Sequence, residues 1–138
     1  MSESYDLKRF TIEQQRSFDR ALAEIKRGKK QTHWMWYIFP QLQGLGHSTM
    51  AMYYEIQSKA EAIDYWNEPI LRSHMVVICQ ELLKLEGSID WIMGYPDNLK
   101  LRSSMTLFWL VTNEPIFKAV LDKFYCGELD DYTVQKMS

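Results

Sequence analysis

Apolar residues recur at helical spacing along almost the whole chain. Phe18, Leu22 and Ile25 follow the i, i+4, i+7 spacing of one buried helix face. A longer stripe of the same kind consists of Leu71, Met75, Ile78, Leu82 and Leu85. A period near 3.6 residues does not suit a strand, whose side chains alternate from face to face. The spacing therefore predicts an all-α fold.

Helix-start and helix-stop residues divide this pattern into about seven to eight helices, some of them short. Gly28 is expected to end the first helix. The sequence Asn-Glu-Pro-Ile occurs twice, at 67–70 and 113–116. Each copy predicts a helix start, because proline suits the first turn and an acid suits the positive end of the helix dipole. Asp97 is expected to cap a helix over residues 99–112.

Length and charge narrow the class of protein. The 138 residues fit a single helical domain spanning 1–138 that needs no disulfide or metal to fold. With 16 basic and 18 acidic residues the net charge is −2, which argues against a nucleic-acid binder. Cys79 and Cys126 have no zinc-type spacing, so no metal and no cofactor are predicted. The chain shows neither a secretory signal nor an apolar run long enough to span a membrane, which favours the cytoplasm.

The segment THWMWYIFPQ, residues 32–41, concentrates aromatic side chains around a histidine. Consecutive residues on a helix point to different sides, so these side chains cannot all face one core. The segment is either buried on two sides or lines a second surface, where Trp34 and Trp36 would stack on a flat ligand. His33, and His47 after the following loop, are the acid–base candidates because imidazole titrates near neutrality.

A second polar cluster lies near the start of the helix that follows Asp97. Lys100, Arg102 and Ser103 stand where free backbone amides favour an anion, and their side chains add further donors. Alternatively, Arg102 pairs with a structural acid and the hydroxyls satisfy the backbone. In the first interpretation Lys30 and Gln41 complete the same site.

Two functions fit these clusters. In the first, the domain binds a small anionic, nucleotide-like metabolite in one pocket lined by the HWMW segment and the KLRSS helix start, with catalysis left open. In the second, it is an interaction module or dimer whose Trp-rich segment is the docking surface. A monomer or a weak homodimer is expected, with no nucleic-acid or membrane partner.

Three stretches resemble the signature of an uncharacterised family, catalogued as domain of unknown function 1810. They are GKK at 28–30, HWMWYIFPQLQGLGHS at 33–48 and DNLKLRSSMTLF at 97–108. The resemblance runs from YDLKRF to FYCGELD and implies a small, mostly helical cytosolic domain without an assigned activity or catalytic residue. The name calpastatin, sometimes applied to the family, denotes a disordered, repetitive inhibitor, unlike this compact, aromatic-rich chain.

Overall fold

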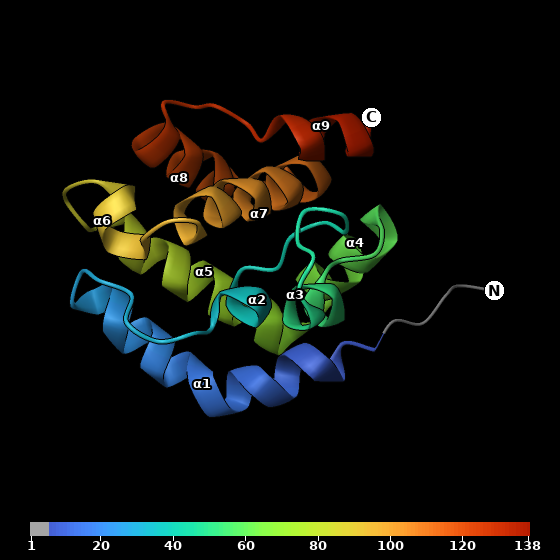
Figure 1. Cartoon of the computed structure of the whole chain (residues 1–138), viewed down its shortest axis with the longest axis horizontal. Helices are drawn as coiled ribbons and strands as arrows, with labels where there is room; N and C mark the ends of the chain where they lie inside the picture. The colour runs from blue at the N-terminus through green and yellow to red at the C-terminus, as the bar shows by residue number, and fades with distance from the viewer. Residues whose placement is uncertain (1–5) are drawn as a thin grey trace.

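Nine α-helices make up residues 6–138, the part of the chain that the computed structural model describes (Figure 1). They are α1 Lys8–Lys26, α2 Met35–Ile38, α3 Thr49–Tyr54, α4 Lys59–Asn67, α5 Pro69–Leu83, α6 Ile89–Met93, α7 Asp97–Thr112, α8 Pro115–Tyr125 and α9 Asp131–Met137. Within the same range, β-type pairing is confined to an isolated bridge between Leu42 and Ile56. The predicted all-α fold is confirmed.

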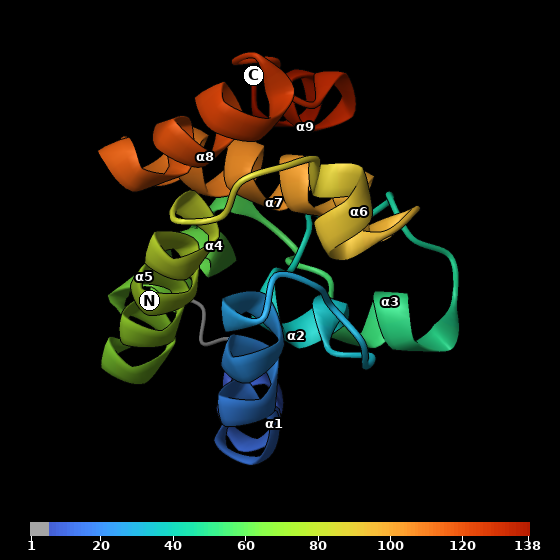
Figure 2. The same ribbon diagram turned by 90° about the vertical axis from the view of Figure 1, so that its left-hand side faces the viewer.

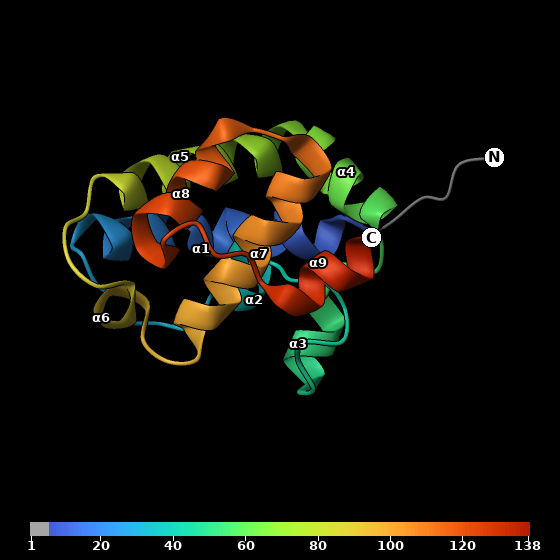
Figure 3. The same ribbon diagram turned by 90° about the horizontal axis from the view of Figure 1, so that it is seen from above.

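The helices stack in layers, from α1 on one side to α8 and α9 on the other (Figures 1 and 2). Helix α1 packs against α2 and α5, and α5 packs against α4 and α8. Helix α7 contacts α4, α6, α8 and α9, so it runs through the middle of the fold. Seen from above, the short helix α3 projects from the body of the domain (Figure 3).

A chain of buried aromatic rings joins these layers. Phe10 of α1 meets Tyr65 of α4 edge-on, with ring centroids 5.0 Å apart. Tyr65 lies 5.2 Å from Phe108 of α7, which lies 5.8 Å from Phe117 of α8. All four side chains are fully buried. Because truncating a buried Phe costs about 3–5 kcal/mol, this chain of rings is a major part of what holds the outer helices to the centre.

Most helix ends follow the local sequence signals. Gly28 adopts φ +90° just after α1, and the two Asn-Glu-Pro-Ile copies begin α5 and α8. The Glu68 carboxylate caps α5 by accepting a 2.8 Å hydrogen bond from the Leu71 N–H. Helix α7 differs from the prediction: it begins at Asp97, and the Asp97 side chain binds Lys30 instead of capping the helix.

Helix α9 was not among the predicted helices. Asp130 caps it, with its carboxylate accepting hydrogen bonds from the N–H and the hydroxyl of Thr133 at 3.0 and 2.7 Å. The Asp130 N–H in turn donates to the buried Thr106 hydroxyl of α7 at 3.0 Å. The helix is only seven residues long, and such short helices are marginal without tertiary contacts. Its packing against α7 therefore stabilises it.

The loop between α2 and α3 is tied to the segment that follows α3. The Ile56 N–H donates to the Gln41 carbonyl at 2.7 Å, and the Gln43 N–H donates to the Ile56 carbonyl at 2.9 Å. Gly44, at the tip, has φ +97°, and a Cβ there would collide with the Tyr132 hydroxyl. That hydroxyl donates to the Gln43 carbonyl at 2.9 Å. The loop is therefore clamped at its base and at its tip.

Candidate functional site

Trp34, the first tryptophan of the aromatic segment, lies in the core. It is 1% exposed, and its indole N–H donates to the buried Glu24 carboxylate at 2.9 Å. The same carboxylate accepts the Thr32 hydroxyl at 2.5 Å and the N–H groups of Gln31 and Thr32 at 2.6 and 3.0 Å. Glu24 thus anchors residues 31–34 to α1. Trp34 keeps almost no surface that a ligand can contact.

The donors around Glu24 also determine its charge. Burial alone would raise the pKa of Glu24, but the hydrogen bonds from Thr32, Gln31 and Trp34 outweigh burial and lower the pKa to about 2. A buried carboxylate is tolerated only when donors replace its lost hydration, and here four donors do so. Glu24 is therefore ionised at neutral pH and acts as a structural anchor.

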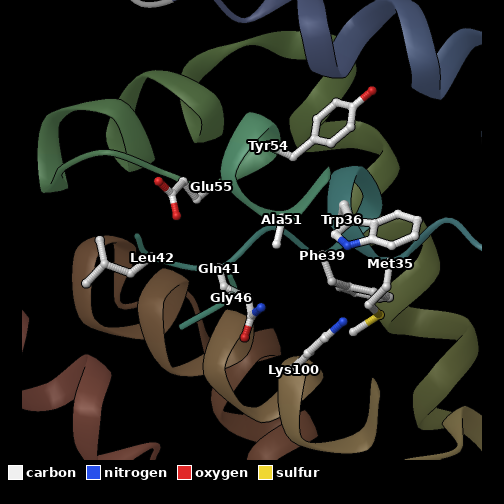
Figure 4. A pocket seen from close by; sticks show the side chains of 10 residues that line it. All are labelled: Met35, Trp36, Phe39, Gln41, Leu42, Gly46, Ala51, Tyr54, Glu55 and Lys100. Carbon is white, nitrogen blue, oxygen red and sulfur yellow. The ribbon is translucent and has the colours of Figure 1, made fainter. Parts of the chain in front are cut away.

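Trp36 lies two residues further on and faces a different surface. It lines a cleft between α2, the following loop, α3 and the first turn of α7 (Figure 4). The lining residues are Met35, Trp36, Phe39, Gln41, Leu42, Gly46, Ala51, Tyr54, Glu55 and Lys100. The Lys100 ammonium lies 5.7 Å from the centre of the Trp36 ring. Three of the residues predicted to bind a ligand, Trp36, Gln41 and Lys100, therefore meet here.

The cleft is narrow in its interior. Its free volume, open mouth included, is about 310 Å³, while the centre of a water molecule can occupy about 10 Å³ of it. That inner space holds about one water molecule, whereas pockets for small-molecule ligands usually measure about 300–1,000 Å³. A larger ligand would therefore have to lie across the mouth or enter after rotation of lining side chains. Gln41 and Lys100 are long, half-buried side chains suited to that movement.

Lys30 and Lys100 share the carboxylate of Asp97. The Lys30 ammonium is 2.9 Å from Oδ2 of Asp97, and the Lys100 ammonium is 3.6 Å from Oδ1. The Lys30 side chain is also buried against the aromatic segment 32–41, where its ammonium donates to the Thr32 carbonyl at 2.7 Å. Two ammonium groups beside one carboxylate leave a positive charge in excess at this end of the cleft. Lys100 lines the cleft. Lys30 does not line it, but its ammonium group binds the same carboxylate and adds to the positive charge there.

Arg102 and Ser103 are not among the residues that line this cleft. Each helical residue turns by about 100°, which places Arg102 about 200° from Lys100 around α7. The Arg102 guanidinium lies 3.8 Å from the exposed Glu128 carboxylate. Ser103 is buried, and its hydroxyl donates to the Leu99 carbonyl at 3.2 Å. Ser103 therefore fits the second interpretation of this cluster, in which the hydroxyl forms a hydrogen bond to the backbone and does not bind a ligand.

The two candidate acid–base histidines, His33 and His47, have exposed side chains. Neither is among the residues that line the cleft, although His47 directly follows Gly46, which does line it. A general acid or base must come within hydrogen-bond reach of the reacting group. A catalytic role for either histidine stays a prediction.

The third histidine, His74, is held by a hydrogen bond and by a stacked aromatic ring. Gln14 donates its amide N–H groups to the Tyr37 carbonyl at 2.6 Å and the Tyr65 hydroxyl at 2.9 Å. Its oxygen must therefore accept from His74, whose Nδ1 lies 2.9 Å away. Phe18 stacks on the imidazole with centroids 3.8 Å apart, and burial lowers the pKa of His74. No local sequence pattern revealed this network, because Gln14 is 60 residues from His74.

The cleft also contains residues that the sequence pattern did not single out. Glu55, Gly46 and Ala51 all line it. A Cβ on Gly46 would lie 2.5 Å from the Ala51 side chain, so glycine is required for the wall to close there. The loop glycines signalled a close approach of this kind. Glu55 had no signal, because only the tertiary fold brings it opposite Lys100.

Two further features of residues 6–138 bear on the site. No group of three or more His, Cys, Asp or Glu side chains in this range is placed to hold a metal ion. In the same range, none of the helices combines the length and the apolar character that crossing a membrane requires.

The fold and the cleft define a small all-α domain in which an aromatic segment and the first turn of a central helix enclose a polar–aromatic cleft. The chain belongs to the family described as Protein of unknown function (DUF1810), whose model matches residues 4–137. This result confirms the resemblance seen in the sequence motifs.

The crystal structure of the conserved hypothetical protein Rv1873 from Mycobacterium tuberculosis is similar to this one. The TM-score is 0.94 and the sequence identity 41%, over 96% of each chain. No curated protein matches the chain.

Proposed function

We propose that this domain binds a small anionic ligand with a flat ring in the cleft between α2, α3 and the first turn of α7. The observation that supports the proposal is that Trp36 and Lys100, from segments far apart in the sequence, line the same cleft with 5.7 Å between the ammonium and the ring centre. A nucleotide-like metabolite has the required chemistry, because it combines an aromatic base with a phosphate.

Each lining group would make a different contact. The half-buried Trp36 ring offers a surface on which a flat group can stack. Lys100 supplies a positive charge for the acidic group, and the neighbouring Lys30 adds to the local potential because Asp97 neutralises only one of the two. Gln41 provides an amide for hydrogen bonds. A few polar groups within a largely apolar wall are typical of small-molecule sites.

The alternative, that the Trp-rich segment docks a partner protein or a second copy, has less support. Trp34 and Met35 are 1% and 3% exposed, so they are not available on a surface. Docking surfaces centre on large side chains that become buried upon association, and here only Trp36 is partly open. A change in oligomeric state caused by Trp36→Leu, measured by sedimentation, would support this alternative instead.

Calorimetric titration with cytidine and adenosine monophosphate, phenylalanine and 3-phenylpropionate tests the proposal, with inorganic phosphate as an acid without a ring. Loss of one hydrogen bond to a charged group costs about 1.5 kcal/mol or more. We therefore expect Lys100→Gln, and similarly Trp36→Leu, to weaken binding of a ring-bearing acid about tenfold.

Two variants serve as matched controls. Arg102→Gln removes one positive charge from the same helix but outside the cleft, and Trp91→Leu removes a tryptophan that is 65% exposed. Both should bind the ligand as the unchanged protein does. Binding by none of the compounds would refute the proposal, as would equal weakening by Lys100→Gln and Arg102→Gln. Melting temperatures of all variants confirm that each one folds.

A further inference from the structure

Glu55, which lines the cleft, carries the carboxylate opposite Lys100. Figure 4 shows its carboxylate on the far side of the cleft from Lys100, with Gly46 and Gln41 between them. The carboxylate accepts one long hydrogen bond, 3.4 Å from the Gly44 N–H. Among residues 6–138 no lysine, arginine or histidine lies within ion-pair distance of it. A half-buried carboxylate with so few donors has free acceptor capacity at the wall of the cleft.

The backbone on both sides of Glu55 is held in place. Arg9 donates to the carbonyls of Tyr53 and Glu55 at 2.9 and 3.0 Å. The next residue, Ile56, donates its N–H to the Gln41 carbonyl at 2.7 Å. Glu55 and Gln41 therefore project from two segments that are bonded to each other. The fold thus fixes the backbone of Glu55 on the cleft wall, and the carboxylate itself is held by one long hydrogen bond.

The charges of the cleft are separated between its two sides. On the α7 side, Lys30 and Lys100 share one carboxylate, Asp97, which leaves a positive excess. On the opposite side, Glu55 supplies a negative charge that forms no ion pair with any residue of the described range 6–138. A ligand that is only anionic would satisfy Lys100 and would be repelled by Glu55. A bipolar ligand, which carries an acid at one end and a hydrogen-bond donor at the other, satisfies both.

We infer that the natural ligand of this cleft is bipolar, with an acidic group at Lys100 and an amino group at Glu55. The inference rests on the proposed function and specifies its ligand class. The amino group is either an exocyclic amine on a flat ring or an aliphatic ammonium, and both donate to a carboxylate. A hydrogen bond to a charged acceptor contributes about 1.5–3 kcal/mol, so Glu55 would discriminate strongly between ligands with and without the amino group.

Matched pairs of compounds test the inference by calorimetric titration. Cytidine and uridine monophosphate differ by an amino group in place of an oxo group on the ring. Phenylalanine and 3-phenylpropionate share a ring and a carboxylate, and only the first has an ammonium. We expect the amino member of one pair to bind about tenfold more tightly. The pair that shows the difference identifies the source of the amino group.

Glu55 variants assign that difference to the carboxylate. Glu55→Ala should abolish the preference for the amino compound, and Glu55→Gln, which keeps a neutral acceptor, should reduce it. Glu128→Gln is the matched control, because it removes an exposed carboxylate outside the cleft. Melting temperatures check that the Glu55 variants fold.

The outcomes separate the inference from the proposed function. If both members of each pair bind equally and Lys100→Gln weakens them, the bipolar inference is overturned and the anion site stands. A preference that persists in Glu55→Ala also overturns the inference. If no compound binds, both proposals fall.

Discussion

Replacement of Glu24 by glutamine should destabilise the domain strongly, because Glu24 is the buried anchor of the segment that precedes α2. Glutamine keeps the shape of the side chain but removes the charge. The N–H groups of Gln31, Thr32 and Trp34 donate to Oε1, and the Thr32 hydroxyl donates to Oε2. A glutamine oxygen can keep the three N–H donors, but its amide N–H group would face the Thr32 hydroxyl. That hydroxyl would have to accept instead of donate, and the other hydrogen bonds would lose their charged acceptor. A hydrogen bond to a charged group contributes about 1.5–3 kcal/mol, against about 0.5–1.5 kcal/mol for a neutral one.

The pKa of Glu24 gives an independent value for the contribution of its carboxylate to the free energy of unfolding. Folding lowers this pKa from its usual 4.5 to about 2, because the hydrogen bonds outweigh burial. At about 1.4 kcal/mol for each pKa unit, the ionised form contributes about 3 kcal/mol to the free energy of unfolding. Since folding lowers this pKa, the contribution is complete above pH 4.5 and is lost as the pH falls toward 2.

Urea unfolding of the unchanged protein and of Glu24→Gln, at several pH values between 7 and 2, measures both effects. We expect the variant to lose about 3 kcal/mol at pH 7, and the difference between the two proteins to shrink below pH 4.5. Glu86→Gln, at an exposed glutamate, is the matched control and should change little. A loss below about 0.5 kcal/mol at pH 7, or a difference that does not depend on pH, would refute this reasoning.

Two other predictions concern single contacts. Gly44→Ala should lower the free energy of unfolding by about 2 kcal/mol, since Gly44 has φ +97° and its new Cβ would collide with the Tyr132 hydroxyl; an unchanged urea midpoint would contradict this. His74 should titrate below 6.5 in a proton NMR titration, because burial disfavours its charged form. Its contribution to stability is complete above that pH and declines as the pH falls below it, so unfolding of His74→Gln should depend less on pH between 7.5 and 5.5. A pKa of His74 at or above 6.5 would show that the burial argument is wrong.

Local sequence signals predicted most of the helices for a reason that the structure makes clear. Both Asn-Glu-Pro-Ile copies begin helices, and Gly28 follows the end of α1, because proline and glycine restrict or permit backbone angles whatever surrounds them. The start of α7 was predicted less well. Asp97 has the chemistry of a cap, but Lys30, distant in sequence, binds its carboxylate instead.

The residues of the cleft, too, were predicted in part from local sequence signals and in part only from the tertiary structure. Consecutive aromatic residues indicated that the segment around Trp36 faces two surfaces, and the structure places Trp34 in the core and Trp36 on the cleft. Helical geometry also separates Lys100 from Arg102 by about 200°, a separation that the spacing in the sequence already indicates. Glu55 could not be found in this way, since it carries no pattern of its own.

The sequence by itself determined that this chain forms an all-α domain, and where most of its helices begin and end, because helical periodicity and end signals act over a few residues. Only the tertiary structure decided which polar groups meet. Packing between helices and loops brings Lys30 to Asp97, and it places Glu55 across the cleft from Lys100. It also buries Trp34 against Glu24, ten residues earlier in the chain. The physical reason is that burial and charge depend on neighbours in space, which local patterns do not specify.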